Sequence, residues 1–308
     1  MVTFYAKNNG LVPVQSLNEA QWISVVNPTD TEKDFILNEL HIPEAFYNDI
    51  EDMDERPRIE DENGWQLIIL RIPFKNSSTH LPYSTAPLGI IYKGSTFVTI
   101  CFAKNAMIKD FVAYTQRKNI DIPDNYHLVL RLLLSSSIWF QKYIKQISLL
   151  IKAAEDNLEK SIRNEDLQKL LQIEKCLVYF ITSLKGNEML FNRIKNLKAC
   201  KDTFDPDLVE DVEIELRQAQ DMSTIYSDIL TGTMDAYASV ISNNLNIIMK
   251  RLTSISIILM IPTLVASFYG MNVPNALQEN PHGLWVIALL SFIMSAVAVV
   301  LFKKKNLF

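Results

Sequence analysis

Cysteine is scarce in this chain, and its three residues lie far apart. Cys101, Cys176 and Cys200 show no CxxC spacing, so the sequence predicts neither a disulfide framework nor a zinc knuckle. We expect reduced thiols in a part of the protein that faces the cytoplasm. The N-terminal stretch MVTFYAKNNGLVPVQ also lacks the basic start and apolar core of a cleaved signal peptide.

Clustered basic residues are missing as well. The chain has 30 Lys and Arg against 35 Asp and Glu, a formal net charge of -5, and no basic stripe with interleaved aromatic residues. Nucleic-acid binding depends on clustered cations that face phosphates. Nucleic acid is therefore not expected as a partner.

Catalytic motifs are absent from the first 200 residues. His41, His80 and His127 do not have the spacing of metal ligands, and there is no GxxxxGK[ST] loop or nucleophile motif. We do not expect an enzyme. The alternative, a membrane-anchored cytoplasmic enzyme or sensor, would predict a featureless apolar anchor.

Charge is absent from two long stretches near the C-terminus. LTSISIILMIPTLVASFY, residues 252–269, has no ionisable group except its tyrosine, and LWVIALLSFIMSAVAVVLF, residues 284–302, has none. Each stretch is long enough to cross a bilayer as a helix. Two buried core helices are the alternative explanation of this apolar composition.

Basic residues flank the outer ends of this pair of stretches. Lys250 and Arg251 precede the first, residues 303–305 follow the second, and none lies between them. This placement favours a membrane hairpin over two core helices. By the positive-inside rule, both basic ends, and with them the N- and C-termini, lie in the cytoplasm. Residues 270–283 then lie on the external side of the cytoplasmic membrane.

The rest of the chain predicts a cytoplasmic α/β domain followed by helices. Residues 65–74, 88–93 and 95–102 have the composition of strands, and residues 31–40 have that of a helix. From residue 126 onward, apolar residues recur at helical spacing. A single helix is expected from Asp207 to Phe268, with Gly232 as its weak point. The predicted divisions are an α/β domain (1–125), a helical region (126–206), a stalk helix (207–251), a first span (252–269), an external loop (270–283), a second span (284–302) and a basic tail (303–308).

Polar, small and thioether residues recur along the predicted long helix with a period of 3.5 residues. Steps of three and four join Ser239 to Ser267, where an ordinary coiled-coil seam would hold leucine and isoleucine. One explanation is close helix packing, in which small hydroxyl side chains donate to the backbone carbonyl one turn earlier. This explains only part of the seam. A water-lined surface explains all of it. Because two helices cannot enclose a pore, several copies of the chain would surround a symmetry axis. The residues expected to line the pore are Asn246, Met249, Leu252, Ser256, Met260, Thr263 and Ser267, with apolar rings at Met249 and Leu252 and a hydrated-ion ring at Asn246.

The segment ASVISNNLNIIMKRLTSISIILMIPTLVASFYGMN, residues 238–272, is followed by a short loop, a second span and a lysine cluster. With Gly-Met-Asn at the outer end of the penultimate span, directly after Tyr269, it resembles the CorA family of magnesium transporters. The resemblance implies a homopentamer with a cytoplasmic funnel, stalk helices that line the pore, and Gly270, Met271 and Asn272 as the outer selectivity element. It implies Mg²⁺ as the cargo, with Co²⁺ and Ni²⁺ as further ions. A sister branch that carries zinc has a different residue between the glycine and the asparagine, so Met271 favours magnesium; a zinc transporter of the same fold is the alternative.

The chemistry of Gly-Met-Asn suits a hydrated ion. Mg²⁺ sheds water reluctantly, and neutral carbonyls can bond its hydration shell without trapping the ion. A ring of Asn272 side chains offers one acceptor oxygen and one NH₂ donor per copy. Gly270 would allow the tight turn that ends the helix. A plain helix C-cap is the other explanation of this motif.

The run DIEDMDERPRIEDE, residues 49–62, holds eight carboxylates and two arginines. A solvated acidic face explains such a run. The family resemblance implies instead that Asp49 and Asp211 are positions where intracellular Mg²⁺ bridges neighbouring protomers and holds the pore shut. Two facing carboxylates repel each other when the ion leaves, which would loosen the ring. The acidic residue that the family has before Asp49 is Asn48 here, which predicts a weaker sensor.

Overall fold

The structure is a computed structural model that describes residues 1–76, 81–160, 164–197, 205–271 and 281–305. The chain divides into two compact units, Met1–Gly232 and Thr233–Phe308. The boundary falls at Gly232, which lies inside a helix and has no heavy atom within 4 Å of the place a side chain would start.

The first unit is built on a seven-stranded sheet with the order β2-β1-β3-β7-β6-β5-β4. Neighbouring strands are antiparallel except β3 and β7, which pair in parallel with Ile23 opposite Val98. The carboxyl ends of these two strands therefore meet at one edge of the sheet. The strands are β1 (Val2–Lys7), β2 (Leu11–Val14), β3 (Trp22–Val26), β4 (Arg58–Glu62), β5 (Trp65–Lys75), β6 (Tyr83–Lys93) and β7 (Thr96–Cys101).

The centre of the sheet is buried on both faces, which explains the nearly unbroken apolar run of β5. Its alternate residues Leu67 and Ile69 belong to one core cluster, whereas Ile68 and Leu70, also fully buried, do not. Side chains of a strand point to opposite faces in turn, so two separate sets of helices must cover them.

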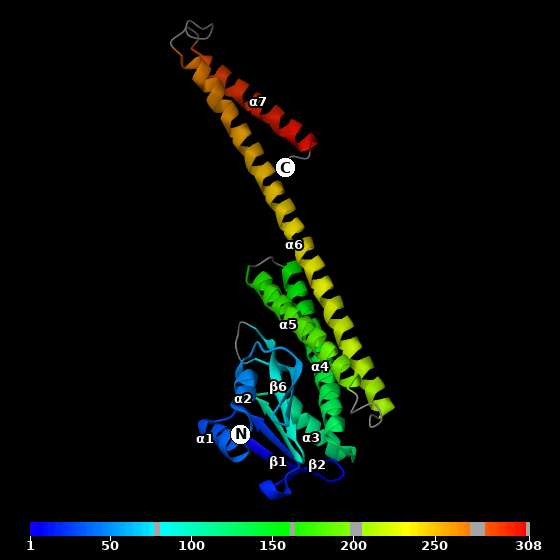
Figure 1. Cartoon of the computed structure of the whole chain (residues 1–308). Helices are drawn as coiled ribbons and strands as arrows, with labels where there is room; N and C mark the ends of the chain where they lie inside the picture. The colour runs from blue at the N-terminus through cyan, green and yellow to red at the C-terminus, as the bar shows by residue number, and fades with distance from the viewer. Residues whose placement is uncertain (77–80, 161–163, 198–204, 272–280, 306–308) are drawn as a thin grey trace. The chain divides into compact units, whose positions relative to one another are not determined.

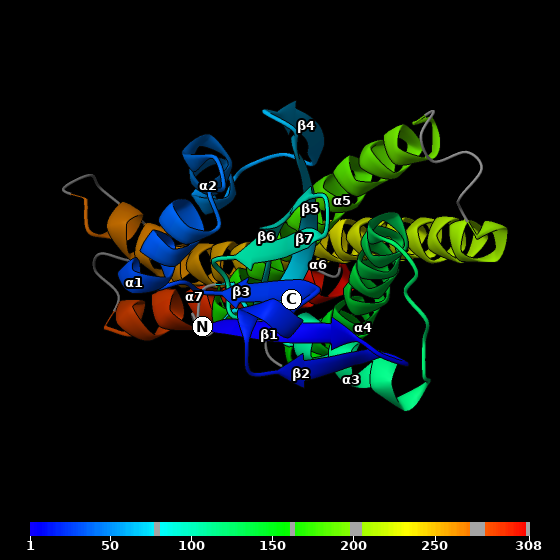
Figure 2. The ribbon, with the colours of Figure 1, turned by 60° about the horizontal axis from the view of Figure 1, so that its bottom comes forward.

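Short helices cover one face and long helices cover the other (Figure 2). On the first face lie α1 (Asp30–Asp34), a π-helical turn (Phe35–Glu39) and α2 (Glu44–Glu51), whose Phe46 and Ile50 are fully buried in the cluster with Leu67. On the second face α4 (Asn125–Lys160) and α5 (Asn164–Lys195) pack on β5, and α3 (Met107–Arg117) packs on β2. A short 3-10 helix, Leu17–Glu19, joins β2 to β3.

Local signals explain where α1 begins. The Thr29 hydroxyl accepts a hydrogen bond from the Glu32 N–H, and the Glu32 carboxylate accepts one from the Thr29 N–H, which forms a capping box. The helix predicted over residues 31–40 is observed here as α1 and the π-helical turn. The strand predicted over residues 88–93 is the end of β6, which begins at Tyr83.

The helix predicted between Asp207 and Phe268 is observed as α6 (Pro206–Tyr269), 64 residues long and about 96 Å at 1.5 Å per residue. Its first turns pack in the first unit, where Leu208, Val212 and Leu216 are buried. The second unit contains the rest of α6 and α7 (Gly283–Lys304), which turns back beside the end of α6 (Figure 1).

Candidate ion pathway and regulatory residues

The end of α6 carries the first two residues of the Gly-Met-Asn motif. The Gly270 N–H donates to the Ala266 carbonyl (2.9 Å), so the helical hydrogen bonding continues to this point. Positive φ among the described glycines is confined to Gly10, Gly64 and Gly94, so the freedom expected of Gly270 at a tight turn is not used. A β-carbon there would lie 3.2 Å from the Ala266 oxygen. Glycine at position 270 therefore avoids a close contact between a β-carbon and the carbonyl of the preceding helical turn.

Met271 is 54% exposed at this helix end. Asn272, the residue on which the selectivity prediction depends, lies outside the described residues, so its role stays a prediction. The structure thus defines where the motif begins, at the end of the first predicted span.

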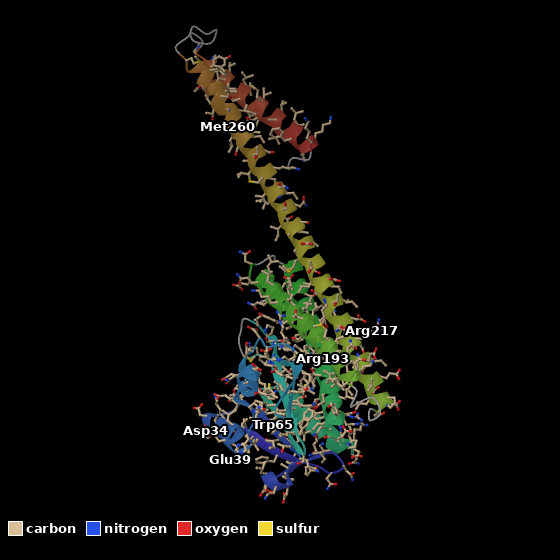
Figure 3. All side chains as sticks on the ribbon, viewed as in Figure 1. Asp34, Glu39, Trp65, Arg193, Arg217 and Met260 are labelled. Carbon is tan, nitrogen blue, oxygen red and sulfur yellow. The ribbon has the colours of Figure 1, made fainter. Side chains whose placement is uncertain are left out.

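The predicted pore-lining residues lie on a face of α6 that is largely exposed among the described residues of the second unit. Met260, visible in Figure 3, is 65% exposed, and Ser254 and Val265 are buried. At about 100° per residue these buried positions lie roughly opposite the seam. The second unit therefore leaves the seam free to face water or another chain. Of the predicted pore-lining residues, Ser256 is half-buried and the others are exposed, namely Asn246, Met249, Leu252, Met260, Thr263 and Ser267.

The hydroxyl groups of the seam bond back to their own helix. The Ser256 hydroxyl donates to the Leu252 carbonyl (2.9 Å), and the Thr263 hydroxyl donates to the Leu259 carbonyl (3.4 Å). This is the geometry expected if the hydroxyls serve helix packing. Each hydroxyl oxygen keeps acceptor capacity for water, however. The contacts within one chain are compatible with both explanations of the seam.

The predicted regulatory residue Asp49 already has a cationic partner. It lies near the end of α2 and accepts from the Arg58 guanidinium of β4 at 2.6 Å. Arg58 also pairs with Glu60 (3.1 Å) and with Glu55. One guanidinium thus serves three carboxylates, which leaves an excess of negative charge.

The pKa of Asp49 reflects this excess. Burial of the carboxyl raises its pKa, and the charge of Arg58 lowers it. The negative charges of Glu55 and Glu60 also raise the pKa of Asp49, so it stays above the ordinary value for aspartate. A further cation at this cluster would favour the ionised carboxylate.

Arg71 of β5 holds the loop that follows Asp49. Its buried guanidinium donates to the backbone carbonyls of Met53 (2.7 Å) and Glu55 (3.0 Å). The backbone of Arg71 is held in turn by the Asn187 side chain of α5, whose amide accepts from the Arg71 N–H and donates to the Arg71 carbonyl, both at 2.8 Å. The acidic run is therefore anchored to the sheet and to α5.

The structure does not bring Asp49 and Asp211 together within one chain. Asp211 is exposed on the first part of α6, and no contact joins the two carboxylates in the described ranges. Over the same ranges no group of three or more His, Cys, Asp and Glu side chains is placed to hold a metal ion. A site that uses both residues would need a second copy of the chain.

Comparison with known proteins decides the family. The family model described as "CorA-like Mg2+ transporter protein" matches residues 18–304. The chain belongs to this family. It is a divalent-cation transporter of the membrane and not an enzyme.

Relatives of this CorA-like chain match it along most of its length. A cobalt/magnesium transport protein CorA from Methanocaldococcus jannaschii is 27% identical over 92% of this chain and 90% of its own. One from Thermotoga maritima is 24% identical over 96% of this chain and 86% of its own. The solved structure of the complete CorA from M. jannaschii superposes with a TM-score of 0.82, covering 99% of this chain and 98% of the other at 24% identity.

The two apolar helices of the CorA-like chain fit the predicted membrane hairpin. Among the described residues, α6 and α7 are long and apolar enough to cross a membrane, and only 11% and 0% of their most apolar windows is buried. Core helices of a soluble protein would be mostly buried. The low burial of α6 and α7 therefore favours membrane spans over core helices.

Sequence reasoning missed Arg58 and Arg71 in the CorA-like chain. A signal for each was present. Arg58 and Glu60 are two residues apart in a strand and so share a face. Arg71 is the one charge within the apolar run WQLIILRIPF, and a charge in such a run indicates a buried group with several acceptors.

Proposed function

We propose that this chain forms a homo-oligomeric channel that carries Mg²⁺, with Co²⁺ and Ni²⁺ as further ions, across the cytoplasmic membrane. The observation that carries the proposal is the uncharged polar seam of α6, exposed opposite the buried face of the same helix. Its hydroxyl and thioether groups suit an ion that crosses with its water shell. The Gly-Met-Asn motif at the end of this helix is the proposed selectivity element.

The exposed middle of α6 supports an assembly of several copies. Leu245, Ile248 and Met249 are 57%, 60% and 52% exposed on a helix stretch that precedes the membrane. Isolated apolar side chains are common on surfaces, but a run along one helix indicates a contact face. We propose that copies of α6 meet here around the pore axis, as a pentamer by resemblance to the family.

Flux in reconstituted liposomes tests the proposed cargo. Purified protein in liposomes loaded with a magnesium dye should admit Mg²⁺, and more slowly Co²⁺ and Ni²⁺, when each ion is added outside. Zinc influx that exceeds Mg²⁺ influx under the same gradient would replace the magnesium proposal with the zinc alternative.

Cysteine labelling should reveal the proposed topology. With Cys200 changed to serine, a cysteine in place of Asn275 should react with an impermeant thiol reagent in intact cells, and one in place of Lys305 should not. Native background should be low because Cys101 and Cys176 are buried, and burial raises the pKa of Cys101 to about 11, which leaves little reactive thiolate at neutral pH. Labelling at Lys305→Cys alone would reverse the orientation.

Removal of the two proposed regulatory carboxylates should weaken closure. In Asp49→Ala with Asp211→Ala, a bridging Mg²⁺ loses two anionic ligands, so a several-fold higher internal Mg²⁺ should be needed for half-maximal closure in liposomes. The matched control is Asp61→Ala with Asp221→Ala, which removes one exposed carboxylate from the acidic run 49–62 and one from α6. Closure of the first double variant at the wild-type Mg²⁺ concentration would place the sensor elsewhere.

A further inference from the structure

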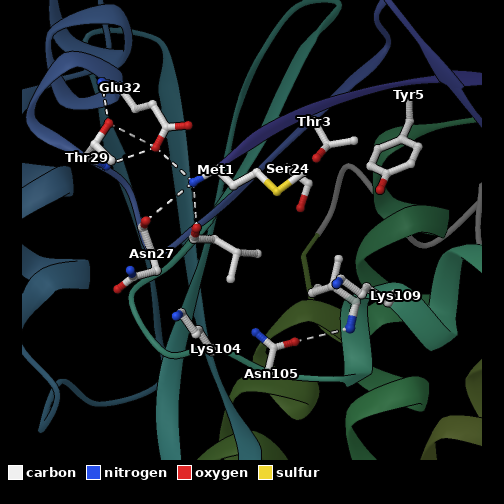
Figure 4. A pocket seen from close by; sticks show the side chains of 12 residues that line it. Met1, Thr3, Tyr5, Ser24, Asn27, Thr29, Glu32, Lys104, Asn105 and Lys109 are labelled. Carbon is white, nitrogen blue, oxygen red and sulfur yellow. Dashed lines mark hydrogen bonds and ion pairs between the residues drawn. The ribbon is translucent and has the colours of Figure 1, made fainter.

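A cavity of about 600 Å³ lies on the α3 side of the sheet in the first unit (Figure 4). Alternate residues of β1 and β3 form its floor, where Thr3 lies directly opposite Ser24 in the strand register. The first turn of α3, with Ile108 and Lys109, forms a wall. The volume is within the range of roughly 300–1,000 Å³ typical of small-molecule sites.

The position of the cavity is one that favours ligands. The loops that follow the parallel strands β3 and β7 supply its rim, including Asn27 after β3 and Lys104 and Asn105 after β7. In α/β sheets ligands bind outside the carboxyl ends of parallel strands, where the loops diverge. The cavity is therefore formed by strands β1 and β3, by the first turn of α3 and by the two loops that follow β3 and β7.

Ser24 gives an independent indication of a ligand. The residue is only 3% exposed and lines the cavity, yet its hydroxyl makes no hydrogen bond to any described residue. The hydroxyl oxygen itself is not sealed from solvent, so it opens into the cavity, where it can hydrogen-bond a polar group of a bound molecule.

The charges around the cavity favour an anion. Lys104 and Lys109 form no ion pair in the described part of the chain and lie on one side of the cavity, across from Met1 and Ser24 (Figure 4). The acidic group of the lining, Glu32, is already held by the N-terminal amine at 2.8 Å. The N-terminal end of α3 adds a partial positive charge, and the Asn105 side chain, one residue before the N-cap Ala106, accepts from the Ile108 N–H at 3.2 Å.

We propose that this cavity binds a phosphorylated small molecule with a flat apolar part, the chemistry of a nucleoside monophosphate. Lys104 and Lys109 contact the phosphate, since lysine is a common phosphate ligand in proteins. Ser24 and Thr3 hydrogen-bond the polar edge of the molecule. Tyr5, Val26 and Ile108 contact its apolar part. The cavity is far larger than inorganic phosphate alone requires.

Equilibrium dialysis of the full-length protein in detergent with labelled AMP tests the proposal. AMP is the probe because it binds Mg²⁺ weakly and so does not disturb the transported ion. Lys104→Met with Lys109→Met should weaken AMP binding at least about tenfold, since two charge-assisted contacts are lost. Ser24→Ala should weaken it roughly fivefold, the value of one neutral hydrogen bond. Lys118→Met with Lys152→Met removes two exposed lysines that do not line the cavity and should leave binding unchanged.

Competition identifies the ligand class. Unlabelled AMP should displace the probe at lower concentration than ribose 5-phosphate or inorganic phosphate, because only AMP combines the phosphate with a flat apolar part. Absence of AMP binding at millimolar concentration would overturn the proposal. So would AMP binding that the Lys104 and Lys109 changes leave intact, or equal displacement by inorganic phosphate. The readout is binding alone, so a failure here leaves the proposed transport function unaffected.

Discussion

Replacement of Asn272 by alanine should abolish Mg²⁺ uptake while the oligomer remains assembled. If five copies each lose one hydrogen bond of about 1 kcal/mol to the hydrated ion, the outer site weakens by roughly several thousand-fold. Uptake into dye-loaded liposomes measures the effect, and size-exclusion chromatography of the same preparation measures assembly.

The control for Asn272→Ala is Asn275→Ala, which removes the same amide three residues farther along the loop. We expect wild-type uptake from this control. If Asn272→Ala also transported Mg²⁺ at the wild-type rate, the amide would serve only as a helix cap, and the proposed selectivity element would be lost.

Asn272→Asp separates binding from conduction. A ring of carboxylates should hold divalent ions more strongly than a ring of amides and release them more slowly. Mg²⁺ flux should therefore fall while Mg²⁺ occupancy, measured by equilibrium dialysis, rises. A rise of both together would indicate that ion release at the mouth does not limit the flux.

Gly89→Ala should be the most destabilising single methyl addition near the proposed regulatory residue. A β-carbon at Gly89 of β6 would lie 2.1 Å from Cδ1 and 2.4 Å from Cγ1 of Ile50, which is fully buried. Forcing an extra group into a packed core costs about 1–3 kcal/mol, which for a chain of this size lowers the thermal midpoint by roughly 2–5 °C. Thermal unfolding of the full-length protein in detergent measures the shift. Because Ile50 follows Asp49 on α2, displacement of this helix should also disturb the Arg58 cluster.

A double-mutant cycle identifies the cause. Ile50→Ala alone leaves a cavity and should cost about 2–5 kcal/mol. Combined with Gly89→Ala it should cost less than the sum, because the new methyl group enters the vacated space. Gly232→Ala, with no atom within 4 Å, is the control and should not destabilise. Additive losses at Gly89 and Ile50 would show that their contact does not explain the effect.

The acidic run 49–62 shows the limit of reading a site from sequence. Its charge and its similarity to a family element pointed to Asp49, and this role stays a prediction. The sequence did not reveal that Arg58 pairs with Asp49 across nine residues, or that Arg71 and Asn187 anchor the following loop. These contacts join α2, β4, β5 and α5, and such long-range pairings are set by how the sheet and helices pack.

The sequence alone determined the helices α6 and α7 and the apolar strands, because each depends on a local property. Freedom from charge over a span's length and apolar residues at helical or alternate spacing are visible within one segment. Tertiary structure alone decided the parallel pairing of β3 with β7, which are separated by more than 60 residues. It also decided the cavity beside Ser24 and the face of α6 that stays exposed. Each of these depends on which distant segments meet, and the free energy of such contacts is not encoded in any one stretch of the chain.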